Sequence, residues 1–479
     1  MVENQEMLEW IDERQQRFTA VADEIWRHPQ TALCETEACA LQIQELEREG
    51  FKITRNVGDL PTAFVAEWGS GRPIIGFLGE YDALPGLSQK LQATQDPEVA
   101  GGPGHGCGHN LLGTSAMAAA MAVKAWMEAG GRQGTVRYYG CPAEETLIGK
   151  VYMARDGVFD DLDASVTWHP SGFVNTSRGS SNAMDNLKFR FHGRTAHAGG
   201  NPERGRSALD AVELMNVGVN YMREHVIDKA RIHYVITNGG GAPNVVPDEA
   251  EVWYYVRAPE RDQVDELTNW VRQIAQGAAM MTQTTVEEDF QGGCYNVLPN
   301  FALADLGQSM LEALGPMEFT QDEQDYAQTV ISGFPPGTRE ASMRGRGLPL
   351  SLIEKPLNGT AQPAQDEGKT GGGSTDVGDV SWITPTVQVH ATTYPAGIPG
   401  HSWGITATGA TSIGHKGMLH AAKAMALTGA ALFMHPEEIE KAQAEFKDRT
   451  DGKPYKSPIP DGIEPPVPAH VRAQARAKA

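Results

Sequence analysis

The order of the elements expected between residues 182 and 294 constrains the fold most strongly. Residues 186–192 alternate apolar and polar side chains, with Leu187, Phe189 and Phe191 on one face, which indicates a half-buried strand. Similar patterns predict, in order, a helix at 207–225, strands at 231–237 and 249–257, a helix at 264–280 and a strand at 284–290. This β-α-β-β-α-β order is that of a split ferredoxin-like unit. Because it lies inside the chain, it predicts an inserted lid or dimerisation domain.

The segments on either side predict an α/β catalytic domain, so the expected fold class is α/β with two domains. Short apolar runs alternate with helical stretches, beginning with one long helix over residues 4–26. Residues 318–372 are polar and rich in Gly, Pro, Gln and Asp, which predicts irregular loops. The expected limits are 1–181 for the first catalytic part, 182–294 for the lid, 295–441 for the second catalytic part and 442–479 for a surface tail.

Charge and cysteine usage exclude several classes of protein. The net charge of −21 should repel nucleic acid and acidic membranes. The first ten residues are acidic and lack an apolar core, so we expect no signal peptide, and no stretch approaches the length of a transmembrane helix. The five cysteines are an odd, sparse set, which argues against a disulfide framework and favours the cytoplasm.

One glycine-rich segment carries soft metal ligands. Residues 104–110 read Gly-His-Gly-Cys-Gly-His-Asn and place Cys107 and His109 just before a stretch that predicts a buried helix. Cysteine and histidine are common ligands of zinc-like ions, and glycines let the backbone fold tightly around an ion. The ordinary alternative is a glycine-rich turn with a buried cysteine. This alternative explains less well why three cysteine or histidine side chains occur within five positions.

Three other segments carry acids or a histidine where predicted strands end. Glu80 and Asp82 follow one apolar run, Glu144 and Glu145 follow another, and His169 ends a third. Taken alone, each of these segments is better explained as a solvent-exposed turn or as a histidine whose hydrogen bonds are made within the fold. Open α/β sheets place their sites outside the carboxyl ends of strands, so together they predict one site. There one glutamate could bind metal while its neighbour takes a proton from bound water, whose pKa a metal lowers toward ~7.

Longer runs are specific enough to indicate a family. They are Gly-Glu-Tyr-Asp-Ala-Leu-Pro at 79–85, Gly-His-Gly-Cys-Gly-His-Asn-Leu-Leu-Gly at 104–113, Gly-Arg-Ser-Ala-Leu-Asp-Ala at 205–211, Ser-Thr-Asp-Val-Gly-Asp-Val-Ser-Trp at 374–382 and His-Lys-Gly-Met at 415–418. The chain thereby resembles the aminoacylase/carboxypeptidase-G-type metallopeptidase superfamily, in its cysteine-ligand amidohydrolase branch. This likeness covers nearly the whole chain. It implies an α/β catalytic domain interrupted by a ferredoxin-like lid, and a pair of divalent ions, Zn²⁺ or Mn²⁺.

The resemblance also implies roles for individual residues in the catalytic domain. The implied metal ligands are Cys107, His109, Glu145, His169 and His401. Glu144 becomes the general base, and Asp82 would orient a ligand histidine. His401, in the run Gly-His-Ser-Trp at 400–403, precedes the last apolar helix as the family's late ligand does, and His415 remains an alternative.

In the lid, the resemblance implies three further functional residues. His197, in the run Gly-Arg-Thr-Ala-His-Ala-Gly at 193–199, would reach the active site of a neighbouring chain and stabilise the oxyanion. Asn244 and Arg257 would hold the substrate carboxylate, for which arginine is suited. Without the resemblance, a turn histidine, a strand-end asparagine and a surface arginine would be the better interpretation. The implied assembly is a homodimer, with a hetero-oligomer containing a related subunit left open.

Two departures from the family pattern concern loops near the expected metals. Asn110 and Leu112 stand where the branch often has Asp and a further His. Glu144 and Glu145 are followed by Thr-Leu-Ile at 146–148, which is bulkier than the expected glycine-rich run. Both departures leave the precise substrate open.

The expected function is hydrolysis of the amide bond of an N-acyl or N-aroyl amino acid such as p-aminobenzoyl-glutamate. Another acyl-amino-acid or dipeptide hydrolase of the same family is the first alternative. A cysteine hydrolase built on Cys107 is a second, although His109 is too close in sequence for a good nucleophile–base pair. A non-catalytic partner of a related catalytic subunit is a third, against which the intact Glu144 argues.

Overall fold

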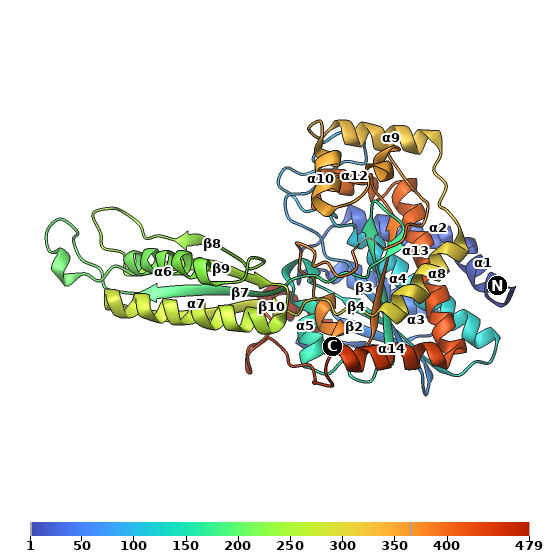
Figure 1. Cartoon of the computed structure of the whole chain (residues 1–479), viewed down its shortest axis with the longest axis horizontal. Helices are drawn as coiled ribbons and strands as arrows, with labels where there is room; N and C mark the ends of the chain where they lie inside the picture. The colour runs from blue at the N-terminus through green and yellow to red at the C-terminus, as the bar shows by residue number, and fades with distance from the viewer. Residues whose placement is uncertain (1, 365, 479) are drawn as a thin grey trace.

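A mixed sheet and a smaller antiparallel sheet organise the chain into two domains, which lie end to end in the computed structural model (Figure 1). The structure describes residues 2–364 and 366–478. The large sheet has the spatial order β1 (Lys52–Arg55), β2 (Phe64–Ser70), β4 (Gly134–Cys141), β3 (Ile74–Glu80), β5 (Ala164–Ser171), β11 (Thr386–Thr392) and β6 (Asn175–Thr176). Strands β4, β3, β5 and β11 run parallel, so their carboxyl ends meet at one edge.

Two long apolar helices pack against one face of this sheet and against each other, α4 (His109–Ala129) and α13 (Ser412–Met434). In β5, Val166 and Trp168 belong to this core, so His169, the residue after Trp168, faces the opposite side. The remaining helices of this domain are α1 (Val2–Glu13), α2 (Gln15–Arg27), α3 (Thr36–Arg48), α5 (Gly149–Arg155), α8 (Phe301–Leu314), α9 (Gln321–Ser332), α10 (Thr338–Arg346), α11 (Val377–Ser381), α12 (Trp403–Thr408), α14 (Pro436–Arg449) and α15 (Ala469–Lys478). Hydrophobic burial by α4 and α13 fixes which side of the sheet is left for polar residues.

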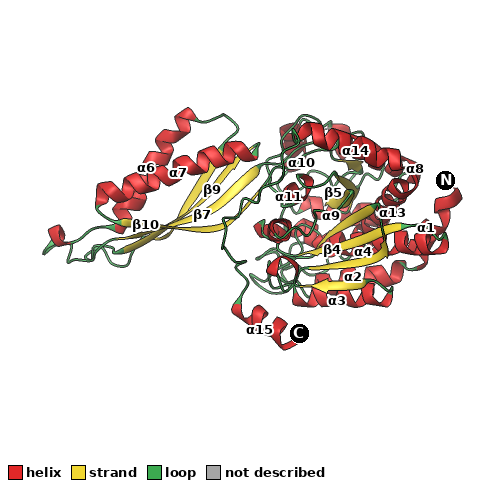
Figure 2. Cartoon of the chain, turned by 90° about the horizontal axis from the view of Figure 1, so that it is seen from below, coloured by secondary structure: helices red, strands yellow, loops and turns green. Residues whose placement is uncertain are grey.

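The smaller domain is a four-stranded sheet with two helices on one face (Figure 2). Its elements in chain order are β7 (Ala183–His192), α6 (Ala208–Met222), β8 (Arg231–Asn238), β9 (Glu249–Ala258), α7 (Arg261–Thr282) and β10 (Thr285–Cys294). The strands lie in the order β10-β7-β9-β8, and all neighbours are antiparallel. The predicted β-α-β-β-α-β order and the two-domain α/β fold class are confirmed.

The prediction of irregular loops over residues 318–372 is wrong for part of that stretch. The structure has α9 and α10 there, together with the short helix η5 (Leu350–Ile353). Thr320 and Glu323 form a capping box at the start of α9. The only apolar residues that this helix buries, next to Glu323, are Ala327 and Val330. Such a narrow apolar stripe among polar residues gives a weak periodic signal, although the capping box is readable in the sequence.

Two expectations about the ends of the chain also need correction. The first helix is broken at Arg14 into α1 and α2, rather than continuous. The C-terminal segment is not only a surface tail, because α14 crosses residue 441 and the later Ile459 and Val467 are buried against the catalytic domain. By length and composition alone α13 could cross a membrane, but 72% of its apolar window is buried inside the protein, as in a core helix.

Candidate metal centre

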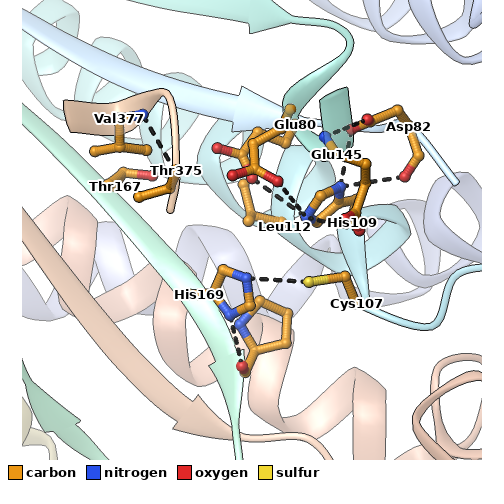
Figure 3. Close-up of polar contacts among 12 residues, drawn as sticks. Glu80, Asp82, Cys107, His109, Leu112, Glu145, Thr167, His169, Thr375 and Val377 are labelled. Carbon is orange, nitrogen blue, oxygen red and sulfur yellow. Dashed lines mark hydrogen bonds and ion pairs between the residues drawn. The ribbon is translucent and has the colours of Figure 1, made fainter. Parts of the chain in front are cut away.

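The predicted site residues gather at the edge of the large sheet where its parallel strands end. Strand β3 ends at Glu80, the short helix η2 (Glu144–Thr146) follows β4, and His169 lies near the end of β5. Cys107 and His109 approach from the glycine-rich turn before α4 and from its first residue (Figure 3). Segments far apart in sequence therefore contribute to one site, as expected at the carboxyl edge of an open sheet.

The first group of ligand-type atoms combines Cys107, His109 and His169, whose ligand atoms lie within 4.8 Å of one another. The Sγ atom of Cys107 lies 3.3 Å from Nε2 of His169. Nδ1 of His169 donates to the carbonyl oxygen of Pro170 at 2.8 Å, and Nδ1 of His109 lies 2.9 Å from Oδ1 of Asp82. These partners orient both rings so that each Nε2 is directed toward the centre of the group.

The second group contains Cys107 again, with Glu145 and His401, and its ligand atoms also lie within 4.8 Å of one another. Nε2 of His401 is 3.4 Å from Oε2 of Glu145, and the His401 side chain is 58% exposed. The backbone N–H of Glu145 donates to Oδ2 of Asp82 at 2.9 Å. Asp82 therefore contacts both groups, and Cys107 belongs to both.

Glu144 lies beside these groups with its carboxylate directed toward His109. Its Oε2 is 3.9 Å from Nε2 of His109, and its side chain is 11% exposed. Burial, together with the neighbouring carboxylates of Glu80 and Glu145, raises the pKa of Glu144 well above its ordinary value. A carboxylate with a raised pKa is suited to accepting a proton near neutral pH.

The composition and contacts of the cluster fit a divalent cation. Nε2 of His109 and Oε1 of Glu145 are buried and have no hydrogen-bond partner within the described part of the chain. Buried polar atoms normally find a partner, so these two atoms are consistent with ligands of an ion. Thiol, imidazole and carboxylate groups are the ligands that zinc-like ions prefer. Burial raises the pKa of the Cys107 thiol, which makes it a poor nucleophile without a cation nearby.

A buried ion triad lies under the cluster, and the sequence pattern did not reveal it. Nζ of Lys150 lies 2.6 Å from Oε1 of Glu80 and 2.6 Å from Oδ1 of Asp376. The other oxygen of Glu80 is 3.4 Å from Nε2 of His109. Glu80 and Asp376 occur in the motif runs at 79–85 and 374–382, which was a usable signal, whereas nothing in the sequence singles out Lys150.

The loop that carries Glu144 is held in an unusual backbone conformation by Glu35. Ala143 and Leu147 flank η2 with φ angles of 56° and 58°, in the left-handed region. Oε1 of Glu35 accepts hydrogen bonds from the backbone N–H groups of Ala143 at 2.9 Å and Leu33 at 2.8 Å, and its Oε2 accepts from the Thr62 hydroxyl at 3.0 Å. Burial raises the pKa of Glu35 to about 8. This carboxyl group was also missed from the sequence.

A cavity of about 550 Å³ opens over the cluster. Its lining includes six of the predicted site residues, which are Cys107, Glu144, Glu145, His169, His401 and Arg257. Thr146 and Leu147, from the bulkier loop, also line it, and the lid contributes Met184, Tyr255 and Arg257. The Arg257 guanidinium lies 5.3 Å from the Tyr255 ring centroid and has no carboxylate within ion-pair distance in the described residues. It can therefore bind an anionic group of a ligand.

The other two predicted lid residues lie outside this cavity. His197 and Asn244 are exposed on adjoining loops of the lid, where the backbone N–H of Ala198 donates to the Asn244 carbonyl at 3.0 Å. Nδ1 of His197 accepts hydrogen bonds from the backbone N–H groups of Gly199 at 3.2 Å and Gly200 at 2.9 Å. Nε2 of His197 must then carry the proton and is available as a donor. Within one chain, neither residue reaches the metal-ligand cluster.

The structure distinguishes the two candidates for the late ligand by position. His401 joins the cluster through Glu145 and Cys107, although it lies in a loop rather than at a strand end. His415 lies on α13, where its Nε2 is 2.7 Å from Oδ1 of Asp23 on α2. The departure at Asn110 is also outside the cluster, because its amide donates to the carbonyls of Ala22 and Gly409.

Comparison with known proteins shows which family the chain is similar to. Residues 180–280 match the family described as the peptidase dimerisation domain. The chain is 44% identical to one of the subunits of the p-aminobenzoyl-glutamate hydrolase of Escherichia coli, over 96% of this chain and 99% of that protein. It is 30% identical to human Xaa-Arg dipeptidase, over 92% of this chain and 91% of that protein. A dinuclear metal-binding M20-family peptidase from Bacillus subtilis has the same fold, with a TM-score of 0.54, 18% identity and coverage of 86% and 98%.

Fold, cluster and relatives together define a two-domain metallohydrolase that acts on amide bonds. More particularly, the chain belongs to the M20 peptidase family, alongside the 44% identical subunit of p-aminobenzoyl-glutamate hydrolase. The family resemblance inferred from the sequence motifs is confirmed, and so is the assignment as an amidohydrolase.

Proposed function

We propose that this chain hydrolyses the amide bond of an N-acyl or N-aroyl amino acid, with p-aminobenzoyl-glutamate as the substrate to test first. The observation that carries the proposal is the meeting of two metal-ligand groups at Cys107, with Glu144 beside them and Arg257 in the same cavity. The substrate class is supported by the name of the relative with 44% identity.

Two divalent ions, Zn²⁺ or Mn²⁺, fit the two groups of ligand atoms. One would be held by Cys107, His109 and His169, and the other by Cys107, Glu145 and His401. When bound, such ions polarise a carbonyl group and lower the pKa of water. Asp82 supports both groups, because it contacts the ring of His109 and the backbone of Glu145.

Glu144 would move the proton during the reaction. Its carboxylate takes a proton from the attacking water and delivers it to the nitrogen of the leaving amine, so the C–N bond breaks and the acid and amine are released. Arg257 would hold the carboxylate of the amino-acid half, since it is a cation without an ion-pair partner in the described chain and lies at the lid side of the cavity. Asn244 would assist from the lid of a second copy.

A homodimer would bring His197 to the neighbouring active site, where its Nε2–H could donate to the developing oxyanion. The surface of the lid supports this assembly. Strand β8 is an edge strand whose Val235 and Ile236 are 54% and 40% exposed, and Tyr221 on the adjacent α6 is 73% exposed. Exposed edge strands and apolar patches are typical of pairing surfaces. A hetero-oligomer with a related subunit is the alternative, because the 44% identical relative is named as one subunit of an enzyme.

We place the protein in the cytoplasm on the chemistry of its cysteines. No disulfide joins the five cysteines in the described residues, and the Cys107 sulfur must stay reduced to bind metal.

A substrate panel with purified chain, reconstituted with Mn²⁺ or Zn²⁺, tests the function. The panel contains p-aminobenzoyl-glutamate, benzoyl-glutamate, acetyl-glutamate and a dipeptide ending in arginine. We expect glutamate release from p-aminobenzoyl-glutamate, loss of activity on chelation and recovery on adding metal. Glu144→Gln should lower kcat about 10²–10⁴-fold while the metal content stays unchanged.

The outcomes separate the alternatives. Activity that survives chelation would instead favour the cysteine hydrolase, and cleavage confined to the dipeptide would favour a dipeptidase. A chain that binds its full complement of metal but stays inactive until a related subunit is added would support the partner-subunit alternative. Full activity of Glu144→Gln would refute the proposed base.

A further inference from the structure

A second cavity, of about 420 Å³, lies beside the metal centre and is not used by the proposed reaction. The two cavities share Ser180 and Gly371 in their walls. They also lie on the same face of β11, because Gln388 lines the first cavity and His390, two residues further on, lines the second. A ligand whose amide bond lies at the cluster could therefore extend into the second cavity.

The second cavity is formed by the catalytic domain alone. Its lining includes no residue between 183 and 294, whereas the first cavity takes Arg257 from the lid. If the amino-acid half of the substrate binds at Arg257, the second cavity is available for the acyl half. The volume lies within the range of about 300–1,000 Å³ that is usual for organic ligands, and a small acyl group would leave most of it empty.

One wall of the cavity is apolar and belongs to a small satellite core. Phe173 and Leu352 are buried in this core, and Leu348 packs against it. The lining also contains Asp366, whose carboxylate already accepts hydrogen bonds from the Ser177 hydroxyl at 2.8 Å and from a backbone N–H at 3.1 Å. The carboxylate is thus engaged, and the apolar wall offers a surface for the nonpolar part of a ligand, beside polar lining residues such as Asn175 and Gln362.

A cation at the rim completes this chemistry. The Arg346 guanidinium lies 5.7 Å from the ring centroid of Phe173, and no carboxylate within the described ranges lies at ion-pair distance from it. An arginine over an aromatic face attracts a further ring through cation–π and stacking contacts. His390 also lines the cavity, although its Nδ1 is itself buried and has no hydrogen-bond partner in the described chain.

We propose that this second cavity is the subsite for an aromatic acyl group, which makes the enzyme selective for aroyl over small acyl amino acids. The inference rests on the proposed function and assigns the acyl half of its substrate. The ring lies against Phe173, Leu348 and Leu352, with Arg346 at its outer face, while the scissile amide stays at the metal-ligand cluster.

The test fills the cavity and compares two substrates. Gly345 lines the cavity on α10, and a Cβ added there meets nothing within 4 Å, so Gly345→Leu should fold while its side chain occupies the space. The matched control is Gly277→Leu on α7 in the lid, where an added Cβ also meets nothing within 4 Å. We expect the ratio of kcat/KM for benzoyl-glutamate over acetyl-glutamate to fall about tenfold or more in Gly345→Leu and to stay unchanged in the control.

A second variant tests the same inference in case Gly345→Leu does not fold. Arg346 is exposed and has no ion pair in the described residues, so Arg346→Ala removes the cation and its contact with the Phe173 ring but breaks no ion pair. It should lower the same ratio a few-fold. If the ratio is unchanged in both variants, the inference is wrong.

A binding measurement keeps this outcome separate from failure of the proposed function. Free p-aminobenzoate is titrated into the metal-loaded chain and followed by ligand-observed NMR. Binding to the unmodified chain and to Gly277→Leu, but not to Gly345→Leu, supports the subsite even if the chain hydrolyses neither glutamate derivative. Absence of binding to the unmodified chain, or equal binding to all three, contradicts the subsite even if p-aminobenzoyl-glutamate is hydrolysed.

Discussion

Among single residues, Asp82 and Glu35 hold the candidate metal ligands and the loop that carries Glu144 in position. Asp82 contacts His109 through one oxygen and the backbone of Glu145 through the other. Glu35 fixes the residue before Glu144 in a left-handed conformation. Strained backbone of this kind persists only where surrounding contacts determine it, which is typical of functional loops.

The Glu35 carboxyl group predicts a pH dependence of stability. Its pKa rises from 4.5 to about 8 in the folded chain because it is buried. Between these values the native state holds a proton that the unfolded state releases, so the contribution of this group is fully present below pH 4.5 and is lost as the pH rises toward about 8. Glu35→Gln keeps an acceptor oxygen and cannot ionise, so its free energy of unfolding should fall less across this range.

Urea unfolding of the unmodified chain and of Glu35→Gln, at about pH 5 and about pH 8, measures how much the free energy of unfolding of each falls with pH. Glu35→Ala serves as the contrasting variant, because it leaves the N–H groups of Leu33 and Ala143 without their acceptor. It should destabilise the fold by about 1–3 kcal/mol at both pH values. An identical decline with pH in the unmodified chain and in Glu35→Gln would show that this carboxyl group does not titrate as expected.

The two candidate late ligands give a second prediction for single residues. His401→Ala should lower the bound metal from two ions per chain toward one, because it removes a side chain from the group that contains Glu145. His415→Ala is the matched control, since His415 pairs with Asp23 on a different surface. Elemental analysis after gel filtration measures the number of metal ions bound per chain. Loss of metal in His415→Ala, with His401→Ala unaffected, would reverse the assignment.

Among secondary-structure elements, periodicity predicts the strongly amphipathic parts and misses the weakly patterned ones. The strands and helices of the lid follow from alternation at residues such as Leu187, Phe189 and Phe191, which are all buried. Helix α9 was missed because its buried stripe is narrow and its surface is otherwise polar. Tertiary packing, rather than local pattern, stabilises such helices.

The same contrast applies to the site. The ligand set could be proposed from motifs because Cys107 and His109 lie in a glycine-rich run before a predicted buried helix, and the paired glutamates follow a recognisable strand. The triad of Lys150 with Glu80 and Asp376 could not, because it joins three elements through contacts between distant residues. Pairing partners of a buried charge are fixed by the tertiary fold and leave no local signature in a single sequence.

The exposed edge strand β8 gives a prediction about assembly. Val235→Lys places a charge in the middle of its exposed apolar run, where Val235 is 54% exposed. If β8 and α6 pair with those of a second copy, this variant should sediment as a monomer and lose most of its activity. Gln276→Lys on α7 is the control for added charge. Sedimentation velocity measures the oligomeric state of both variants. An unchanged dimer in Val235→Lys would show that the dimer contact lies elsewhere.

In the molecule as a whole, our proposal makes the active site of one chain incomplete without the lid of a second chain. The cavity is lined by residues of both domains, whereas His197 and Asn244 lie in the loops after β7 and before β9. These loops are at the end of the lid away from the catalytic domain (Figure 1). The elongated arrangement leaves these lid loops free to contact another molecule. A dimer in which each lid serves the other chain would complete both sites.

Complementation tests this arrangement. His197→Ala and Glu144→Gln should each be nearly inactive, since each lacks one group needed in every site. When the two are denatured and refolded together, a mixed dimer contains one site with both groups intact. About a quarter of all sites should then regain activity if the chains mix at random. Absence of recovery in verified mixed dimers would mean that His197 does not act across the interface.

The proposed chemistry depends on two divalent ions held by the cluster around Cys107. Anomalous diffraction from crystals of the Mn²⁺-loaded chain locates such ions without reference to activity. We predict two anomalous peaks close to the Cys107 sulfur, one beside His109 and His169 and one beside Glu145 and His401. Crystals with full metal content but no peak at this cluster would contradict the proposal.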